Sequence, residues 1–188
     1  MTQRERAEEI LKKYIKTEHF LKHSYSVEAV MRALAKKIEP ANEEEWAIAG
    51  LLHDLDAETI DYRTYPELHG PKAIEILKEE KFGNDNMYHA ICAHNKQSGV
   101  KIQNNIDQAI YAADPITGFI NAITLVYPDK KIESVKVKSI VKRMREVRFA
   151  AGADRKAMAS IAKLKIEFPE FAELALNAMK QISNKIGL

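Results

Sequence analysis

Residues 43–56, EEEWAIAGLLHDLD, combine a helix start, an apolar run and an adjacent histidine and aspartate. Asn42 precedes three glutamates, with Glu45 at the third helical position, which is the pattern of a capping box. We predict a helix over 43–55 that delivers His53 and Asp54 at its end. There the imidazole and the carboxylate can bind one divalent ion. The same pair also suits a helix end whose histidine interacts with terminal carbonyl groups.

The flanking sequence has the 3- and 4-residue apolar spacing of buried helix faces, as at Val27, Val30 and Leu34. Glycine and proline are sparse, seven and six, and they fall mostly between such segments. We therefore predict an all-α fold with a loop over residues 57–68. The expected helices lie at about 3–18, 24–38, 43–55, 70–81, 85–95, 104–127, 133–148, 153–166 and 168–186.

Composition indicates a folded protein, because 46% of the 188 residues are hydrophobic and 30% are charged. The length suits one domain. Charges run through the first twenty residues, so we expect neither a signal peptide nor a membrane span, and a cytoplasmic location. Cys92 is the only cysteine, which excludes an internal disulfide and a cysteine zinc site.

Two more candidate ligands lie far from the His-Asp pair. His23 opens the predicted helix upstream, and Asp114 lies in the apolar segment QAIYAADPITGFINA, residues 108–122. A carboxylate among Tyr111, Ile116 and similar neighbours is costly to bury unpaired, so it should meet a cation or several donors. It could instead cap a helix that begins at Pro115.

This order of His, His-Asp and Asp on successive helices resembles the HD-domain superfamily of metal-dependent phosphohydrolases. The stretches ADPITGFINA, PDKKI, VKSIVKRMREVRFAAGADR and LALNAM also resemble a compact bacterial and archaeal group, the HDIG-type hydrolases, whose members mostly lack an assigned substrate. The resemblance implies a helical bundle whose central metal is bound by His23, His53, Asp54 and Asp114. It implies one domain over 1–188, with a metal-binding core at about 20–128 and C-terminal helices, about 129–188, packed on it.

His69 and His94 lie where dinuclear members, such as the HD-GYP phosphodiesterases and the diadenosine tetraphosphate hydrolases, carry two additional histidines. In those enzymes the aspartate that corresponds to Asp54 bridges both ions, and we interpret the site as built for two. Alternatively, both histidines line the pocket over one metal as hydrogen-bond donors or as a proton-transfer group. We expect His19 and His89 to lie outside the site.

The sequence departs from those dinuclear groups after the His-Asp pair. They tend to carry a lysine there, whereas this chain has Asp56 and Glu58, and no Gly-Tyr-Pro motif follows. Their substrates are therefore not carried over. Asp56 could orient a ligand or the attacking water, although a solvated carboxylate beyond the helix end is the simpler interpretation.

A divalent ion held by imidazoles and carboxylates lowers the pKa of water and promotes hydrolysis. Ligands without thiolate suit Mn, Fe, Co, Ni or Zn, with one or two ions per chain. We predict hydrolysis of a phosphomonoester or phosphodiester of a small, nucleotide-like molecule, with His53, Asp54, His69 and His94 as the catalytic group. The alternatives are a diiron oxygenase and a non-catalytic metal-containing module that senses a nucleotide.

Positive charge is concentrated in residues 130–165, which carry 12 Lys/Arg against 3 Asp/Glu, although the net charge of the chain is only +2. Such a segment is either a solvated helix face or a wall that attracts an anionic substrate. Aromatic residues do not alternate with the basic ones, so we do not expect nucleic acid as a partner. The sequence does not determine the oligomeric state. The candidate phosphate contacts are Lys96, Lys138, Lys142, Arg145 and Arg155.

Overall fold

The computed structural model describes residues 1–188 and contains ten α-helices and no strand, which confirms the predicted all-α fold. The helices are α1 (Gln3–Tyr14), α2 (Glu18–Ile38), α3 (Glu43–Leu52), α4 (Pro71–Glu79), α5 (Asp85–Ala93), α6 (Asn105–Leu125), α7 (Val137–Arg143), α8 (Arg155–Ala159), α9 (Phe168–Lys180) and α10 (Ser183–Ile186). No helix combines the length and the apolar character that a membrane crossing requires.

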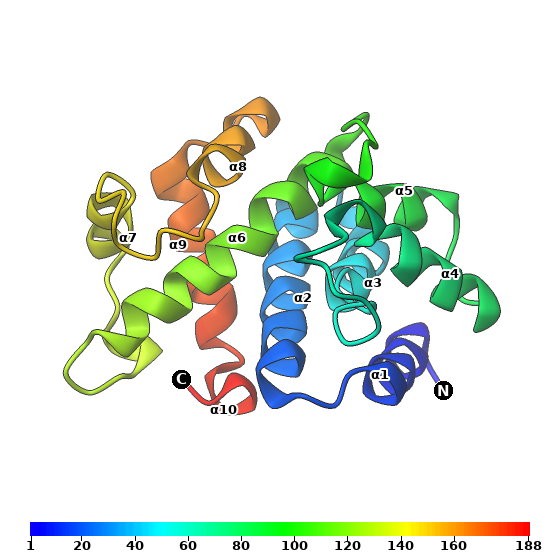
Figure 1. The fold of residues 1–188 in the computed structure, drawn as a ribbon. Helices are drawn as coiled ribbons and strands as arrows, with labels where there is room; N and C mark the ends of the chain where they lie inside the picture. Colours follow the sequence, from blue (N-terminus) through cyan, green and yellow to red (C-terminus); the bar gives the residue numbers. More distant parts are fainter.

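Two long helices, α2 and α6, form the centre of the molecule (Figure 1). Helix α3 packs on α2, and α5 packs on both α3 and α6. On the other side, α9 packs against α2 and α6, and α8 packs against α6. The connection between α3 and α4 and the turn after α5 therefore lie near the middle of α6, where the candidate ligands meet.

A continuous hydrophobic cluster extends from Ala7 in α1 to Ile186 in α10. Its largest fully buried side chains include Trp46, Phe119 and Phe171. Burying each such side chain contributes about 1.5–3 kcal/mol. The core thus includes residues from the N-terminal, central and C-terminal helices.

Gly50 lets α3 approach α2 closely. A Cβ atom at this position would lie 2.9 Å from the carbonyl oxygen of Val27, so any larger residue would force the helices apart. The contact lies two residues before the end of α3. It therefore fixes where the next residues, His53 and Asp54, stand relative to α2.

Helix α2 begins at Glu18, earlier than the predicted residue 24, so His23 lies within the helix and does not open it. The reason is a distant residue. The carboxylate of Glu58, in the loop after α3, accepts hydrogen bonds from the backbone N–H groups of Lys16 and Thr17, at 3.0 and 2.7 Å. This long-range contact fixes the chain as it enters α2.

The predicted capping box at Asn42 is wrong. Asn42 makes no capping hydrogen bond, and its side-chain amide donates to Glu39 at 2.9 Å. A complete capping box occurs at the start of α1 instead, where Thr2 and Glu5 each bond the backbone of the other.

The predicted helices 133–148 and 153–166 are shorter than expected. Asp154 accepts a hydrogen bond from the backbone N–H of Ala157 at 2.9 Å and caps α8, which ends at Ala159. The guanidinium of Arg155 donates to the carbonyl oxygens of Ala150 and Ala153, at 2.9 and 3.0 Å. These bonds hold the connection between α7 and α8 in a non-helical conformation.

Candidate metal centre

Six side chains converge at the middle of α6, and all six were predicted as ligands. His23 comes from α2, Asp114 from α6, and the other four from the residues directly after α3, η2 (Pro66–Leu68) and α5: His53, Asp54, His69 and His94. The Oδ1 atom of Asp54 lies 3.2 Å from Nε2 of His53 and 3.2 Å from Nε2 of His69. The central position of Asp54 is the one predicted for a bridging ligand.

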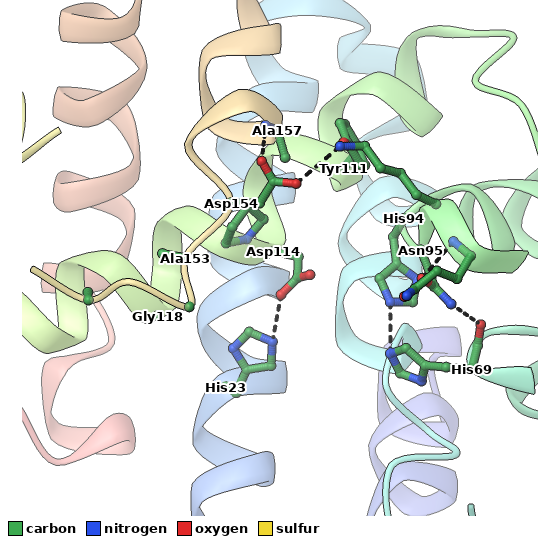
Figure 2. Close-up of a pocket in the computed structure, with 15 residues that line it drawn as sticks. His23, His69, His94, Asn95, Tyr111, Asp114, Gly118, Ala153, Asp154 and Ala157 are labelled. Atoms are coloured by element: carbon green, nitrogen blue, oxygen red, sulfur yellow. Dashed lines mark hydrogen bonds and ion pairs between the residues drawn. The ribbon is translucent and has the colours of Figure 1, made fainter. Parts of the chain in front are cut away.

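The second carboxylate, that of Asp114, lies beside His23 and His53. Its Oδ1 atom lies 3.1 Å from Nε2 of His23 and 3.8 Å from Nε2 of His53. Figure 2 shows the contact between His23 and Asp114 beside the contact between His69 and His94.

Asp114 is not a helix cap, so that alternative is wrong. It lies in the interior of α6, and Pro115 also lies within this helix. Proline lacks the N–H group that would bond the carbonyl of Tyr111, a defect that kinks helices. The side chain of Asp114 is 32% exposed and lines the cavity beside the centre.

Fixed acceptors hold the Nδ1 atoms of three histidines. The Nδ1 atom of His53 lies 2.8 Å from the carbonyl oxygen of Gly50, that of His69 lies 2.8 Å from Asp56, and that of His94 contacts the carbonyl oxygen of Ile91. Because these oxygens only accept, each Nδ1 must donate. The neutral rings therefore present the Nε2 lone pair to the centre.

The Nδ1 atom of His23 can also act as a donor, and here the acceptor is a threonine hydroxyl. The hydroxyl of Thr117 donates to the carbonyl oxygen of Asp114 at 2.9 Å, so its oxygen is free to accept from Nδ1 of His23 at 3.2 Å. Thr117 was not among the predicted site residues. Its position one helical turn after Asp114 is the sequence signal that points to it.

The donor set fits a metal. The Nε2 atoms of His23 and His53 are 3.2 Å apart, and those of His69 and His94 are 3.1 Å apart. Two lone pairs at such a distance repel each other unless a cation or a proton lies between them. Three overlapping groups could each hold an ion: His23, His53 and Asp54; His53, His94 and Asp114; and Asp54, His69 and His94.

The carboxylates and imidazoles of the centre shift one another's pKa values. Burial opposes protonation of His53, but Asp54 and Asp114 outweigh it and raise its pKa to about 9. Burial likewise opposes protonation of His69, whose pKa Asp54 and Asp56 raise to about 10. Burial and the two neighbouring imidazoles lower the pKa of His94 to about 4. With Nδ1 fixed, the proton that titrates on His53 and His69 is on Nε2, where a metal would bind.

Asp56 is fully buried, so the interpretation as a solvated carboxylate is wrong. One oxygen accepts from His69, and the other accepts from the backbone N–H groups of Gly70 and Ala73, at 2.7 and 3.2 Å. Gly70 adopts φ +95°, and a Cβ atom there would lie 3.2 Å from Cα of Cys92. This turn and Asp56 together orient His69.

A cavity of about 790 Å³ opens beside the centre and is lined by His23, His69, His94 and Asp114. Its walls also include residues from η3 (Lys96–Ser98), α6 and the segment before α8. Of the candidate phosphate contacts, the cavity contains Lys96, whose ammonium lies 3.2 Å from Asp154 and 5.2 Å from the centre of the Tyr111 ring. Asp154 and Tyr111 were not predicted as site residues.

The other candidate phosphate contacts do not line this cavity. Lys138 and Lys142 are exposed on α7, and Arg145 is exposed just after it. Arg155 donates to four backbone carbonyl groups and stacks on Phe119, so its guanidinium already has partners. The prediction that these four residues contact substrate is not supported by the structure. Their charges belong to a solvated face or to structural contacts.

The two excluded histidines lie outside the centre. His19 is exposed, and Nδ1 of His89 lies 2.8 Å from the buried carboxylate of Asp107. Neither side chain is part of a potential ligand group.

The model of the HD domain family matches residues 20–118, which is more than half of the chain and contains all six predicted ligands. No curated protein and no solved structure matches the chain significantly.

Proposed function

We propose that this chain, which belongs to the HD domain family, hydrolyses a phosphomonoester or phosphodiester of a small, nucleotide-like molecule at a divalent-metal centre. HD domains are mostly metal-dependent phosphohydrolases. The observation that carries the proposal is the convergence of four imidazoles and two carboxylates on one side of a cavity.

We assign the six ligands to two positions that share Asp54. His23, His53, Asp54 and Asp114 would hold one ion, and Asp54, His69 and His94 would hold the other. The contacts from Asp54 to both His53 and His69, 3.2 Å each, support this division. Imidazole and carboxylate donors suit Mn, Fe, Co, Ni or Zn.

The reaction is a hydrolysis in which water oxygen bonds to phosphorus as the bond from phosphorus to the leaving oxygen breaks. That oxygen takes up a proton that the water gives up, so the products are an alcohol and either inorganic phosphate, from a monoester, or a phosphomonoester, from a diester. A divalent ion supplies Lewis-acid chemistry here, because it lowers the pKa of water and neutralises charge on phosphoryl oxygens. The chain fixes the ligand tautomers through the acceptors at Nδ1. In a centre with a single ion, His69 and His94, which line the cavity, would instead be the groups that can move a proton.

We further propose that the chain belongs to the compact bacterial and archaeal HDIG-type hydrolases, which stretches such as ADPITGFINA and VKSIVKRMREVRFAAGADR resemble. We also propose that residues 1–188 form one domain. One hydrophobic cluster includes residues from α1 to α10, which supports a single domain.

The direct test is hydrolysis by protein purified without chelator and then loaded separately with each of the five metals, measured as release of phosphate from monoesters and of p-nitrophenol from the bis ester. Substrates would include p-nitrophenyl phosphate, its bis ester and nucleoside phosphates. We expect His53→Ala and Asp54→Ala to lower kcat/KM by at least about 10³-fold, a loss of about 4 kcal/mol in transition-state stabilisation, while both variants stay folded. His19→Ala, which removes an exposed histidine outside the centre, is the matched control.

Absence of turnover with every metal would contradict the proposal. Iron-dependent oxygen uptake in place of phosphate release would indicate oxygenase chemistry instead.

A further inference from the structure

The cavity beside the metal centre has two sides with different chemistry. One side carries the candidate metal ligands His23, His69, His94 and Asp114. The rest of the lining extends from Asn95 and Lys96 across Tyr111 and Gly118 to the segment before α8 (Figure 2). A volume of about 790 Å³ leaves room for much more than a phosphoryl group.

The side away from the ligands has no net charge. Its only charged side chains are Lys96 and Asp154, and these two pair with each other at 3.2 Å. The amide of Asn95 is also occupied, because its nitrogen donates to the carbonyl oxygens of Pro66 and His69. A second or third phosphate group would therefore find no free cation, and the unpaired part of its charge would be poorly solvated.

The wall of this side includes a glycine that the backbone does not require. Gly118 lies in the interior of α6, one turn after Asp114, and its φ is not in the left-handed region. A Cβ atom there would meet nothing within 4 Å. Alanine would suit the helix better, so neither backbone conformation nor packing within the protein explains the glycine.

From these observations we propose that the cavity binds the uncharged leaving group of a monoester that carries a single phosphoryl group, and that Gly118 sets the size of this group. The proposal rests on the proposed function and narrows it to a substrate class. The leaving group would lie between Tyr111 and Gly118, with its phosphoryl group toward Asp114. Tyr111 lines the cavity with little exposed surface, and the Lys96 ammonium lies 5.2 Å from the centre of its ring, so Tyr111 forms part of the fixed wall opposite the open space at Gly118.

The test compares the wild-type protein with Gly118→Ala and Gly118→Leu. The Mn-loaded proteins are assayed on adenosine 5′-monophosphate, adenosine 5′-triphosphate and glycerol phosphate. We expect wild-type kcat/KM to be at least about tenfold higher for the monophosphate than for the triphosphate. Leucine at position 118 should lower kcat/KM for the nucleotide at least about tenfold more than for glycerol phosphate, since it fills space that only the larger ester uses.

A second readout does not depend on catalysis. Thermal unfolding is followed with and without uncharged nucleosides, namely adenosine, guanosine, cytidine and uridine. We expect at least one nucleoside to raise the Tm of the wild-type protein and to have no effect on Gly118→Leu. Without ligand, Gly118→Ala should raise the Tm by about 1–4 °C, because the helix gains stability. Ala122→Leu, one turn later in α6 and outside the cavity, is the control for the added side chain.

The inference is overturned if the triphosphate is the better substrate, or if Gly118→Leu lowers turnover of both monoesters equally and no nucleoside binds. It is also overturned if Gly118→Leu unfolds the protein while Ala122→Leu does not, since the space would then not be open. Nucleoside binding without hydrolysis of any ester would reject the proposed function and leave the binding site for an uncharged group in place.

Discussion

Asp54 is the residue on which the candidate centre depends. Its carboxylate contacts His53 and His69 at 3.2 Å each, and His23 and His94 at 3.6 Å each. Although burial favours the neutral acid, the imidazoles of His53, His69 and His23 hold the pKa of Asp54 well below its usual range. A carboxylate that stays ionised among four rings is suited to bridging two cations.

Asp56 provides a test of how the ligands are oriented. In Asp56→Asn, an amide nitrogen facing His69 would donate to Nδ1 and place the ring proton on Nε2, where it blocks a metal. We expect the affinity for the weaker of two bound ions to fall by about 10–100-fold. Competition with a chromophoric chelator measures it.

The matched control for Asp56→Asn is Asp61→Asn, which removes an exposed carboxylate of the same loop. Because Asp56 also accepts two backbone hydrogen bonds, the folded fraction is measured for each variant by circular dichroism. Unchanged metal affinity in a folded Asp56→Asn protein would show that His69 does not need this partner.

The ligand residues could be predicted from the sequence because their types and order carry the signal. His53-Asp54 at a helix end and Asp114 in an apolar segment are visible without a structure. The roles of Asp56 and Thr117 could not be predicted, since they depend on contacts with Nδ1 of His69 and of His23, which only the fold creates. Asp154 and Gly118 became site candidates only when folding placed them on the cavity wall.

Glu8 connects three helices, namely α1, α2 and α10. Its carboxylate in α1 accepts from Tyr25 in α2 at 2.9 Å and lies 3.5 Å from Lys185 in α10. Partial burial disfavours the ionised form, yet hydrogen bonds from Lys12, Arg4 and Tyr25 outweigh it and hold the pKa of Glu8 well below its usual range. These contacts attach the two terminal helices to the central one.

The pH dependence of Glu8 follows from the direction of this shift. Because its folded-state pKa is depressed, its contribution to stability is complete above the unfolded value near 4.5 and is lost as the pH falls below it. We expect Glu8→Gln to reduce the free energy of unfolding by about 1–3 kcal/mol at neutral pH and by less at about pH 3. Urea unfolding at both pH values tests this. Glu9→Gln, at the exposed neighbouring position, should have little effect at either pH.

The basic helix α7 provides a second test at the scale of the helices. Lys138, Lys142 and Arg145 are exposed and do not line the cavity. We expect the triple alanine variant to keep KM for a phosphoester within about twofold of wild type. Lys96→Ala, at the one cavity lysine, should raise KM more, because it leaves the carboxylate of Asp154 unpaired in the cavity, where it would repel an anionic substrate. If KM of the triple variant were instead tenfold higher than that of the wild type, the basic residues of and after α7 would take part in substrate binding.

Helix positions were predictable from apolar spacing, but several helix ends were not. The start of α2 depends on Glu58, which is more than forty residues away from Lys16 and Thr17. The break after α7 depends on Arg155 bonding the carbonyl groups of the preceding segment. Tertiary hydrogen bonds of this kind leave no periodic pattern in the sequence.

At the scale of the whole molecule, the proposed ions would connect segments that lie far apart in the chain. The six ligands extend from His23 to Asp114 and come from α2, α6 and the ends of α3, η2 and α5. Bound metal would therefore stabilise the arrangement of these elements as well as provide chemistry. Sequence order alone cannot show that the segments meet, which is why the convergence is the central structural observation.

The most direct test of this centre is elemental analysis of protein purified without chelator, performed together with Asp54→Ala. We expect one to two transition-metal ions per wild-type chain and a loss of at least one ion per chain in the folded variant. A wild-type protein that binds no transition metal, even after incubation with each of the five ions, would contradict the account. A folded Asp54→Ala protein with its full metal content would contradict it equally.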